Sequence, residues 1–212
     1  MLKIITLSCL AFAFALNLSA QDEQKKEKIE WSIDLGSTYS LIGLSQRAEL
    51  QFGVLATVNR HQFRAAPLFH IWSSEAANKP KDISLSGLAL NYYYNLPTAS
   101  DKFELYFKYE MAFHFYTNEW EGTYYNTEVN AYEAYSDQSS EFFWGNTVAY
   151  GFTYKPSKKM FLRLDFGGGV YVSSIAGEYK DYYGLTNARY DFRGYNDVGF
   201  FVKSAFSVGY NL

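Results

Sequence analysis

The stretch that decides the fold is residues 200–212, which read FFVKSAFSVGYNL. Every second side chain from Phe200 to Leu212 is apolar, with Ser204 as the exception, and the side chains between them are mostly small or polar. This period of two is typical of a β-strand with one apolar and one polar face. The chain stops on that pattern, although chain ends are usually polar. We therefore expect the apolar face of this strand to contact lipid.

The same alternation recurs along the chain and predicts eight strands in all. The expected strands are Ile29–Ser40, Glu49–Asn59, Gln62–Trp72, Leu85–Leu96, Phe103–Tyr116, Phe142–Tyr154, Phe161–Ser174 and Val198–Leu212. Several of them reach the ten or so residues that a tilted membrane-spanning strand needs. Pro67 lies inside the third segment and removes a backbone donor, so we expect that strand to bend or bulge there.

The connections between these segments alternate in length. Short connections at Asn59–His61, Pro97–Lys102 and Lys155–Met160 fall on the same side as both ends of the strand series. Two very long ones, Thr117–Glu141 and Ile175–Asp197, fall on the opposite side. An even strand count with short turns at one end and long loops at the other is typical of bacterial outer-membrane barrels. The predicted fold is therefore an all-β, eight-stranded antiparallel up-and-down transmembrane β-barrel.

Side-chain volume indicates which face of the strands points inward. The interior of an eight-stranded barrel is just wide enough for side chains to fill it. The apolar row is rich in Phe, Tyr, Leu and Trp and would overfill that space, whereas the other row mixes charged residues with Gly and Ala. We therefore expect the polar row to fill the lumen with paired ions. The predicted lumen charge network is Arg64, Glu104, Lys108, Glu110, Arg163, Asp165 and Lys203.

The first twenty residues read as a secretory signal peptide. Lys3 supplies the charged region, an apolar run extends from Ile4 to Leu16, and Ser19-Ala20 is a small-residue cleavage site. Residues 1–20 are thus expected to be removed, together with Cys9, the only cysteine. Residues 21–28 would form a short polar leader and residues 29–212 the barrel domain. The predicted location is the cell outer membrane, reached by export.

The chain resembles the small eight-stranded outer-membrane β-barrels of Gram-negative bacteria, the OmpA-, OmpX- and opacity-protein-like group. The resemblance rests on the signal peptide, the strand and loop rhythm, the apolar last residue and the hairpin-like stretch Gly151–Gly169, GFTYKPSKKMFLRLDFGGG. It implies a barrel surrounded by outer-membrane lipid and lipopolysaccharide. It also implies that the barrel-assembly machinery reads the C-terminal strand, although Leu212 stands where such proteins usually have Phe.

Catalytic chemistry finds little support in these residues. His61 falls in a short turn, and His70 and His114 fall on the polar row near the long-loop ends of their strands. Ser173 and Glu110 could join His114 in a catalytic set, but hydrogen bonding of the histidines to lumen carboxylates is the favoured interpretation. We expect no enzymatic activity, no catalytic residue, no metal site and no cofactor. The net charge of −3 also gives no support for nucleic-acid binding.

The two longest connections carry the functional hypothesis. Both are rich in aromatic residues among Gly, Asn and Asp, a combination that builds binding surfaces. The candidate residues are Trp120, Tyr124, Tyr125, Tyr179, Tyr182, Tyr183, Tyr190 and Tyr195. Alternatively, these tyrosines extend the strands beyond the membrane and form an aromatic belt. The sequence favours a non-enzymatic protein for envelope integrity and for adhesion to an extracellular glycan or protein. A porin-like pore for small solutes and a lipid A-modifying enzyme stay open as alternatives.

Overall fold

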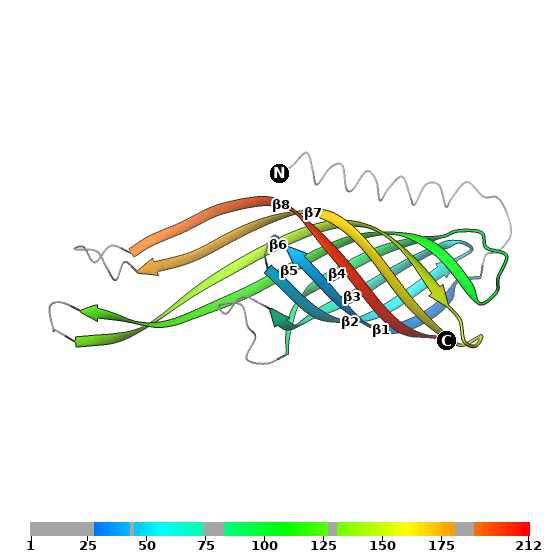
Figure 1. The fold of residues 1–212 in the computed structure, drawn as a ribbon, viewed down its shortest axis with the longest axis horizontal. Helices are drawn as coiled ribbons and strands as arrows, with labels where there is room; N and C mark the ends of the chain where they lie inside the picture. The colour runs from blue at the N-terminus through cyan, green and yellow to red at the C-terminus, as the bar shows by residue number, and fades with distance from the viewer. Residues whose placement is uncertain (1–27, 43–44, 74–82, 127–130, 181–188) are drawn as a thin grey trace.

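The computed structural model describes residues 28–42, 45–73, 83–126, 131–180 and 189–212. These residues form a closed barrel in which each strand pairs antiparallel with the next and β1 pairs with β8 (Figure 1). The strands are β1 (Glu30–Ile42), β2 (Ser45–Val58), β3 (His61–Ser73), β4 (Ser84–Asn95), β5 (Phe103–Asn126), β6 (Ala131–Tyr154), β7 (Met160–Lys180) and β8 (Arg189–Asn211). The predicted fold class and strand count are confirmed. The predicted signal peptide and almost all of the leader lie outside the described residues.

The alternation in sequence becomes an alternation between the outer surface and the lumen. In β7, the outward Phe166 is 66% exposed, whereas its chain neighbour Asp165 is 6% exposed. The same change from apolar outside to charged inside occurs in β5, where Phe107 is exposed and Lys108 is buried. The assignment of the apolar row to the outer surface, made from side-chain volume, is therefore confirmed.

Short turns gather at one end of the barrel. β2 and β3 are joined through Asn59 and Arg60, and Asn59 adopts the left-handed backbone conformation with φ 53°, which asparagine tolerates well. The connections 96–102 and 155–159 lie at the same end. The chain ends of the barrel meet there too, since the Leu212 amide donates to the Trp31 carbonyl at 2.9 Å. No helix among the described residues is long and apolar enough to cross a membrane.

The two longest predicted loops are strands over most of their length, which corrects the sequence prediction. β5 and β6 stay paired to Asn126 and Ala131, and β7 and β8 stay paired to Lys180 and Arg189. β4 pairs with β5 only as far as His114, so both hairpins project well beyond the other strands (Figure 1). These segments are rich in Tyr, which favours extended backbone even outside the barrel wall.

Three register shifts interrupt the regular ladder of the described strands, one of them between Ile175 and Ala176 in the β7–β8 pairing. The register between β3 and β4 shifts between Leu68 and Phe69, directly after Pro67. The predicted irregularity of the third strand is therefore confirmed, as expected from a residue that cannot donate a backbone hydrogen bond. Another shift, between Ala48 and Glu49, displaces the β2–β3 pairing near the end from which the hairpins project.

Candidate functional site

The middle of the lumen holds a buried cluster of alternating charges. Lys108 Nζ of β5 lies 3.0 Å from Asp165 Oδ1 of β7 and 3.1 Å from Glu110 Oε2. The other Glu110 oxygen accepts a hydrogen bond from Lys203 Nζ of β8. The Tyr106 hydroxyl donates to Asp165 Oδ2 at 3.2 Å. Each charge thus has an opposite charge in contact, which offsets the cost of removing these ions from water.

A second ion pair lies apart from this cluster. Arg64 of β3 donates from Nε to Asp34 Oδ1 of β1 at 2.9 Å and from Nη1 to Gln51 Oε1 at 2.6 Å. A third contact joins Arg64 Nη2 to Asp34 Oδ1 at 2.8 Å. The pair fills space above Gly53, where a Cβ atom would lie 2.2 Å from both Arg64 Nε and Asp34 Oδ1. The absence of a side chain at position 53 is therefore what admits this pair.

Two of the predicted network residues are placed differently from the rest. Arg163 bonds neutral partners, since its Nη2 donates to Gln62 Oε1 and its Nε donates to Thr153 Oγ1 at 3.3 Å. Its guanidinium also lies 4.6 Å from the ring centre of Phe161, a cation–π contact. Glu104 is at the short-turn end and partly exposed, where it pairs with Lys155 at 2.5 Å. The predicted network is therefore divided into several separate clusters in the lumen, and Glu104 lies at the short-turn end of the barrel.

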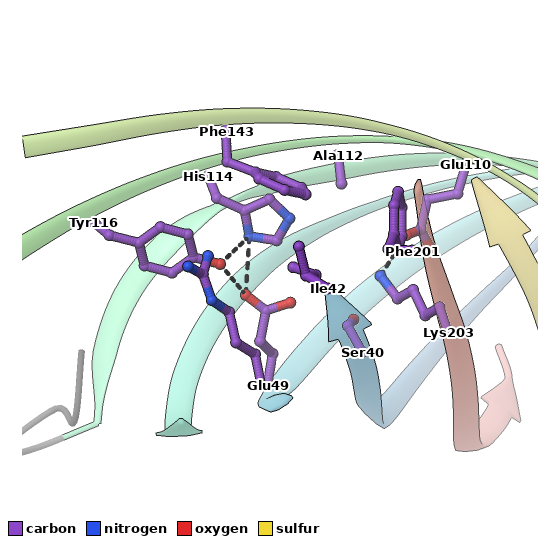
Figure 2. A pocket seen from close by; sticks show the side chains of 11 residues that line it. Ser40, Ile42, Glu49, Glu110, Ala112, His114, Tyr116, Phe143, Phe201 and Lys203 are labelled. Atoms are coloured by element: carbon purple, nitrogen blue, oxygen red, sulfur yellow. Dashed lines mark hydrogen bonds and ion pairs between the residues drawn. The ribbon is translucent and has the colours of Figure 1, made fainter. Parts of the chain in front are cut away.

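A further buried cluster lies toward the projecting hairpins and was not predicted as a unit. Glu49 Oε1 of β2 is 2.9 Å from His114 Nδ1 and accepts a hydrogen bond from the Tyr116 hydroxyl at 3.1 Å (Figure 2). Arg47 lies over the Tyr116 ring at 4.5 Å and pairs with Glu141 of β6 at 3.3 Å. Glu49 and His114 both fall on the polar row of the sequence near the same barrel end. Their common position along the barrel axis is the feature of the sequence from which this contact could have been predicted.

A small cavity separates the cluster around Glu49 and His114 from the central charges around Glu110. It is bounded by Glu49 and His114 on one side and by Glu110 and Lys203 on the other (Figure 2). Its volume of about 10 Å³ has room for about one water molecule. The cavity is therefore too small for an organic substrate.

The expected contact with a lumen carboxylate is found for His114 but not for His70, which contacts a backbone carbonyl instead. The His114 ring contacts Glu49 and Tyr116, and His70 Nε2 lies 3.0 Å from the Trp72 carbonyl oxygen. Ser173 faces His114 across an intervening strand, because Phe143 pairs with both. Among the described residues, Ser173 makes no hydrogen bond with His114, so the candidate catalytic set is not assembled. Within the same residues, no three His, Cys, Asp or Glu side chains are arranged to hold a metal ion.

The predicted position of one histidine is wrong. His61 was expected to be solvated in a turn, but it begins β3 and its Nδ1 lies 2.7 Å from the Tyr92 hydroxyl. The turn is one residue shorter than predicted, so His61 joins the ladder and pairs with Tyr94.

The aromatic candidates for a binding surface belong to the projecting hairpins. The backbones of Trp120, Tyr124 and Tyr125 lie in β5, that of Tyr179 in β7, and those of Tyr190 and Tyr195 in β8. Tyr182 and Tyr183 lie outside the described residues, as do the side chains of the other six. The structure thus gives these residues a strand backbone in place of the predicted loop.

Comparisons with known proteins return likenesses of fold. No family model and no curated protein matches the chain. Among solved structures, the N-terminal β-barrel domain of Pseudomonas aeruginosa OprF is 11% identical with a TM-score of 0.41, and the match covers 87% of this chain and 100% of that one. Neisserial surface protein A is 12% identical with a TM-score of 0.44, covering 87% and 97%. E. coli outer membrane protein W is 15% identical with a TM-score of 0.37, covering 89% and 100%. All three are likenesses of fold at low sequence identity, and the closed barrel of this chain is given by its own strand pairing.

Proposed function

We propose that this protein is an integral outer-membrane barrel that contributes to envelope integrity. The observation that carries the proposal is the inversion of the usual polarity, with apolar side chains outside and paired ions inside. Phe52, Val148 and Phe206 are among many large apolar side chains left exposed, whereas Glu110 and Lys203 are buried. Contiguous apolar surface of this extent is unfavourable in water and is stabilised by acyl chains.

Heat-modifiability tests this proposal directly. The protein, expressed with its own N-terminal segment, should stay in the outer-membrane fraction after a urea wash. It should also migrate differently on a gel before and after boiling, because a closed barrel resists detergent unfolding. Recovery in the soluble fraction, or equal migration of boiled and unboiled samples, would contradict the proposal.

We further infer that the projecting hairpins serve surface interaction. Support comes from their position, since β5–β6 and β7–β8 extend from the end opposite to the short turns. It also comes from the aromatic content of residues 117–126 and 189–195. The partner class that fits such a surface is an extracellular glycan or protein.

Shortening one hairpin provides the test. Replacing residues 118–139 by Asn-Gly keeps the Thr117–Ser140 pair and closes β5 and β6 with a tight turn. We expect this variant to lose adhesion and partner capture while remaining heat-modifiable. A matched full-length variant, Trp120→Ser with Tyr124→Ser and Tyr125→Ser, separates the role of the rings from that of the backbone. Adhesion that both variants retain would count against the hypothesis.

We propose that the protein has no catalytic role of its own. The contacts that His70 and His114 make with Trp72, Glu49 and Tyr116 support this, because they engage Nε2 of His70 and Nδ1 of His114 in the barrel's own packing. Expression should leave the lipid A mass spectrum unchanged relative to an empty vector. A new lipid A species that disappears with His114→Ala or His70→Ala would establish the enzyme alternative.

A further inference from the structure

The short-turn end of the barrel carries a group of lysines on two adjoining turns. Lys102 belongs to the β4–β5 connection, and Lys158 and Lys159 belong to the β6–β7 connection. The two connections touch, since the Lys155 amide donates to the Lys102 carbonyl at 2.8 Å. The second turn is also tied to β8, because the Asn211 amide donates to the Lys159 carbonyl at 2.8 Å. The three lysines are thus held on a fixed backbone.

The ammonium groups of these three lysines have no carboxylate partner among the described residues. Lys155 is different, because its ammonium group forms an ion pair with the Glu104 carboxylate at 2.5 Å. Lys102, Lys158 and Lys159 are exposed, and none of them forms an ion pair in the described part of the chain. Asp101 is the exposed acid next to them in the chain and offsets part of their charge. A positive rim remains on this side of the barrel.

The rim borders the outward apolar surface without a gap. Phe103 and Met160 follow the two turns directly, and both are exposed. Tyr210 of β8 is also exposed, and the Lys159 ammonium lies over its ring at 5.7 Å. Lysine stems can lie along apolar surface while the charged end reaches the water boundary. The lysines therefore lie where the acyl chains of a surrounding lipid give way to its headgroup.

We propose that Lys102, Lys158 and Lys159 form a binding rim for the phosphate of anionic phospholipids in the leaflet at the short-turn end. A lipid suits this surface better than a soluble acidic protein, because it covers the exposed apolar side chains and neutralises the ammonium groups together. Basic clusters at a membrane surface favour anionic lipids by about fivefold per residue, and the preference weakens as salt increases. The inference rests on the proposed membrane insertion.

Spin-labelled lipids measure this preference in the intact protein. The barrel is refolded into nanodiscs of phosphatidylcholine with trace spin-labelled phosphatidylglycerol or spin-labelled phosphatidylcholine, and the immobilised fraction of each is compared. We expect the native protein to favour the phosphatidylglycerol label at least threefold at low salt. Lys102→Gln with Lys158→Gln and Lys159→Gln should bring the ratio close to one. The corresponding triple arginine variant should keep the preference.

The controls separate this inference from the membrane proposal. Lys79→Gln with Lys81→Gln removes two positive charges from another part of the sequence, between β3 and β4, and should leave the ratio unchanged. A native barrel that inserts and is heat-modifiable but shows no preference overturns the rim alone, as does a preference that survives the triple glutamine change. Displacement of the labelled lipid by polyglutamate would indicate a soluble acidic partner and would also overturn it. Failure to insert at all contradicts the proposed membrane protein instead.

Discussion

At the scale of single residues, the lumen is organised by pairs in which each buried ion depends on its partner. Arg64 and Asp34 are both almost fully buried and are joined by three contacts between 2.8 and 3.0 Å. Removing one member of such a pair costs more than the pair contributes, because the remaining charge stays buried without compensation. Small residues beside the ions matter equally, since they provide the space in which the pairs form.

Gly53 is a position where this dependence can be tested. In Gly53→Ala the new methyl group would lie 2.2 Å from Arg64 Nε and Asp34 Oδ1, so the pair must move. We expect a loss of about 1–3 kcal/mol in the free energy of unfolding. Urea titration in detergent micelles measures it. Gly168→Ala is the matched control, since its methyl group would lie 3.4 Å from the nearest atom and should be tolerated. Equal stability of the two variants would contradict the packing argument.

Glu110 is the residue on which the central cluster depends most. Its carboxylate contacts both Lys108 and Lys203, so Glu110→Gln leaves two buried ammonium groups without their shared countercharge. We expect a loss of about 3–5 kcal/mol of unfolding free energy. Glu104→Gln is the matched control at a partly exposed pair and should cost less than about 1 kcal/mol. A Glu110→Gln barrel as stable as the native one would show that the cluster contributes little.

At the scale of strands, alternation in the sequence determines much but not all of the structure. Strand number, the outward row and the turn at Asn59 follow from the period of two and from turn residues. The extent of the two hairpins does not, because polar and aromatic residues such as those of 117–126 are compatible with either a strand or a loop. The contact between Glu49 and His114 does not follow either, since the register shift at Ala48 and the barrel tilt set which residues meet.

The projecting part of the β5–β6 hairpin should contribute little to barrel stability. Beyond Ser139 the structure pairs β6 only with β5, because the β6–β7 ladder ends at the Ser139–Gly177 pair. The variant with residues 118–139 replaced by Asn-Gly should therefore unfold within about 1 kcal/mol of the native protein, since a two-stranded hairpin that packs on nothing else is only marginally stable in water. Urea titration of both proteins in the same micelles measures the difference. A large loss would indicate that the hairpin supports the barrel wall.

At the scale of the whole molecule, lumen contacts connect strands that are not neighbours in the wall. Lys203 of β8 reaches Glu110 of β5, and Arg163 of β7 reaches Gln62 of β3. Arg47 of β2 reaches Glu141 of β6 at 3.3 Å. Two sets of interactions thus hold the barrel together: backbone pairing around its circumference and side-chain contacts across its interior. This cross-linking both stabilises the wall and obstructs the axis, so the pore alternative requires these contacts to open.

Electrical recording tests this obstruction. In planar bilayers the native protein should show no stable single-channel steps, because the central ions are in direct contact and the cavity above them holds about one water molecule. High salt should not change this, since buried pairs are poorly screened. The variant Lys108→Ala with Glu110→Ala and Lys203→Ala removes the central cross-links and leaves those of Arg47 and Arg163, so it should show small steps that the native protein lacks. Lys158→Ala at the exposed rim serves as the control. Steps in the native protein that the triple variant leaves unchanged would establish a pore along another path and contradict the closed lumen.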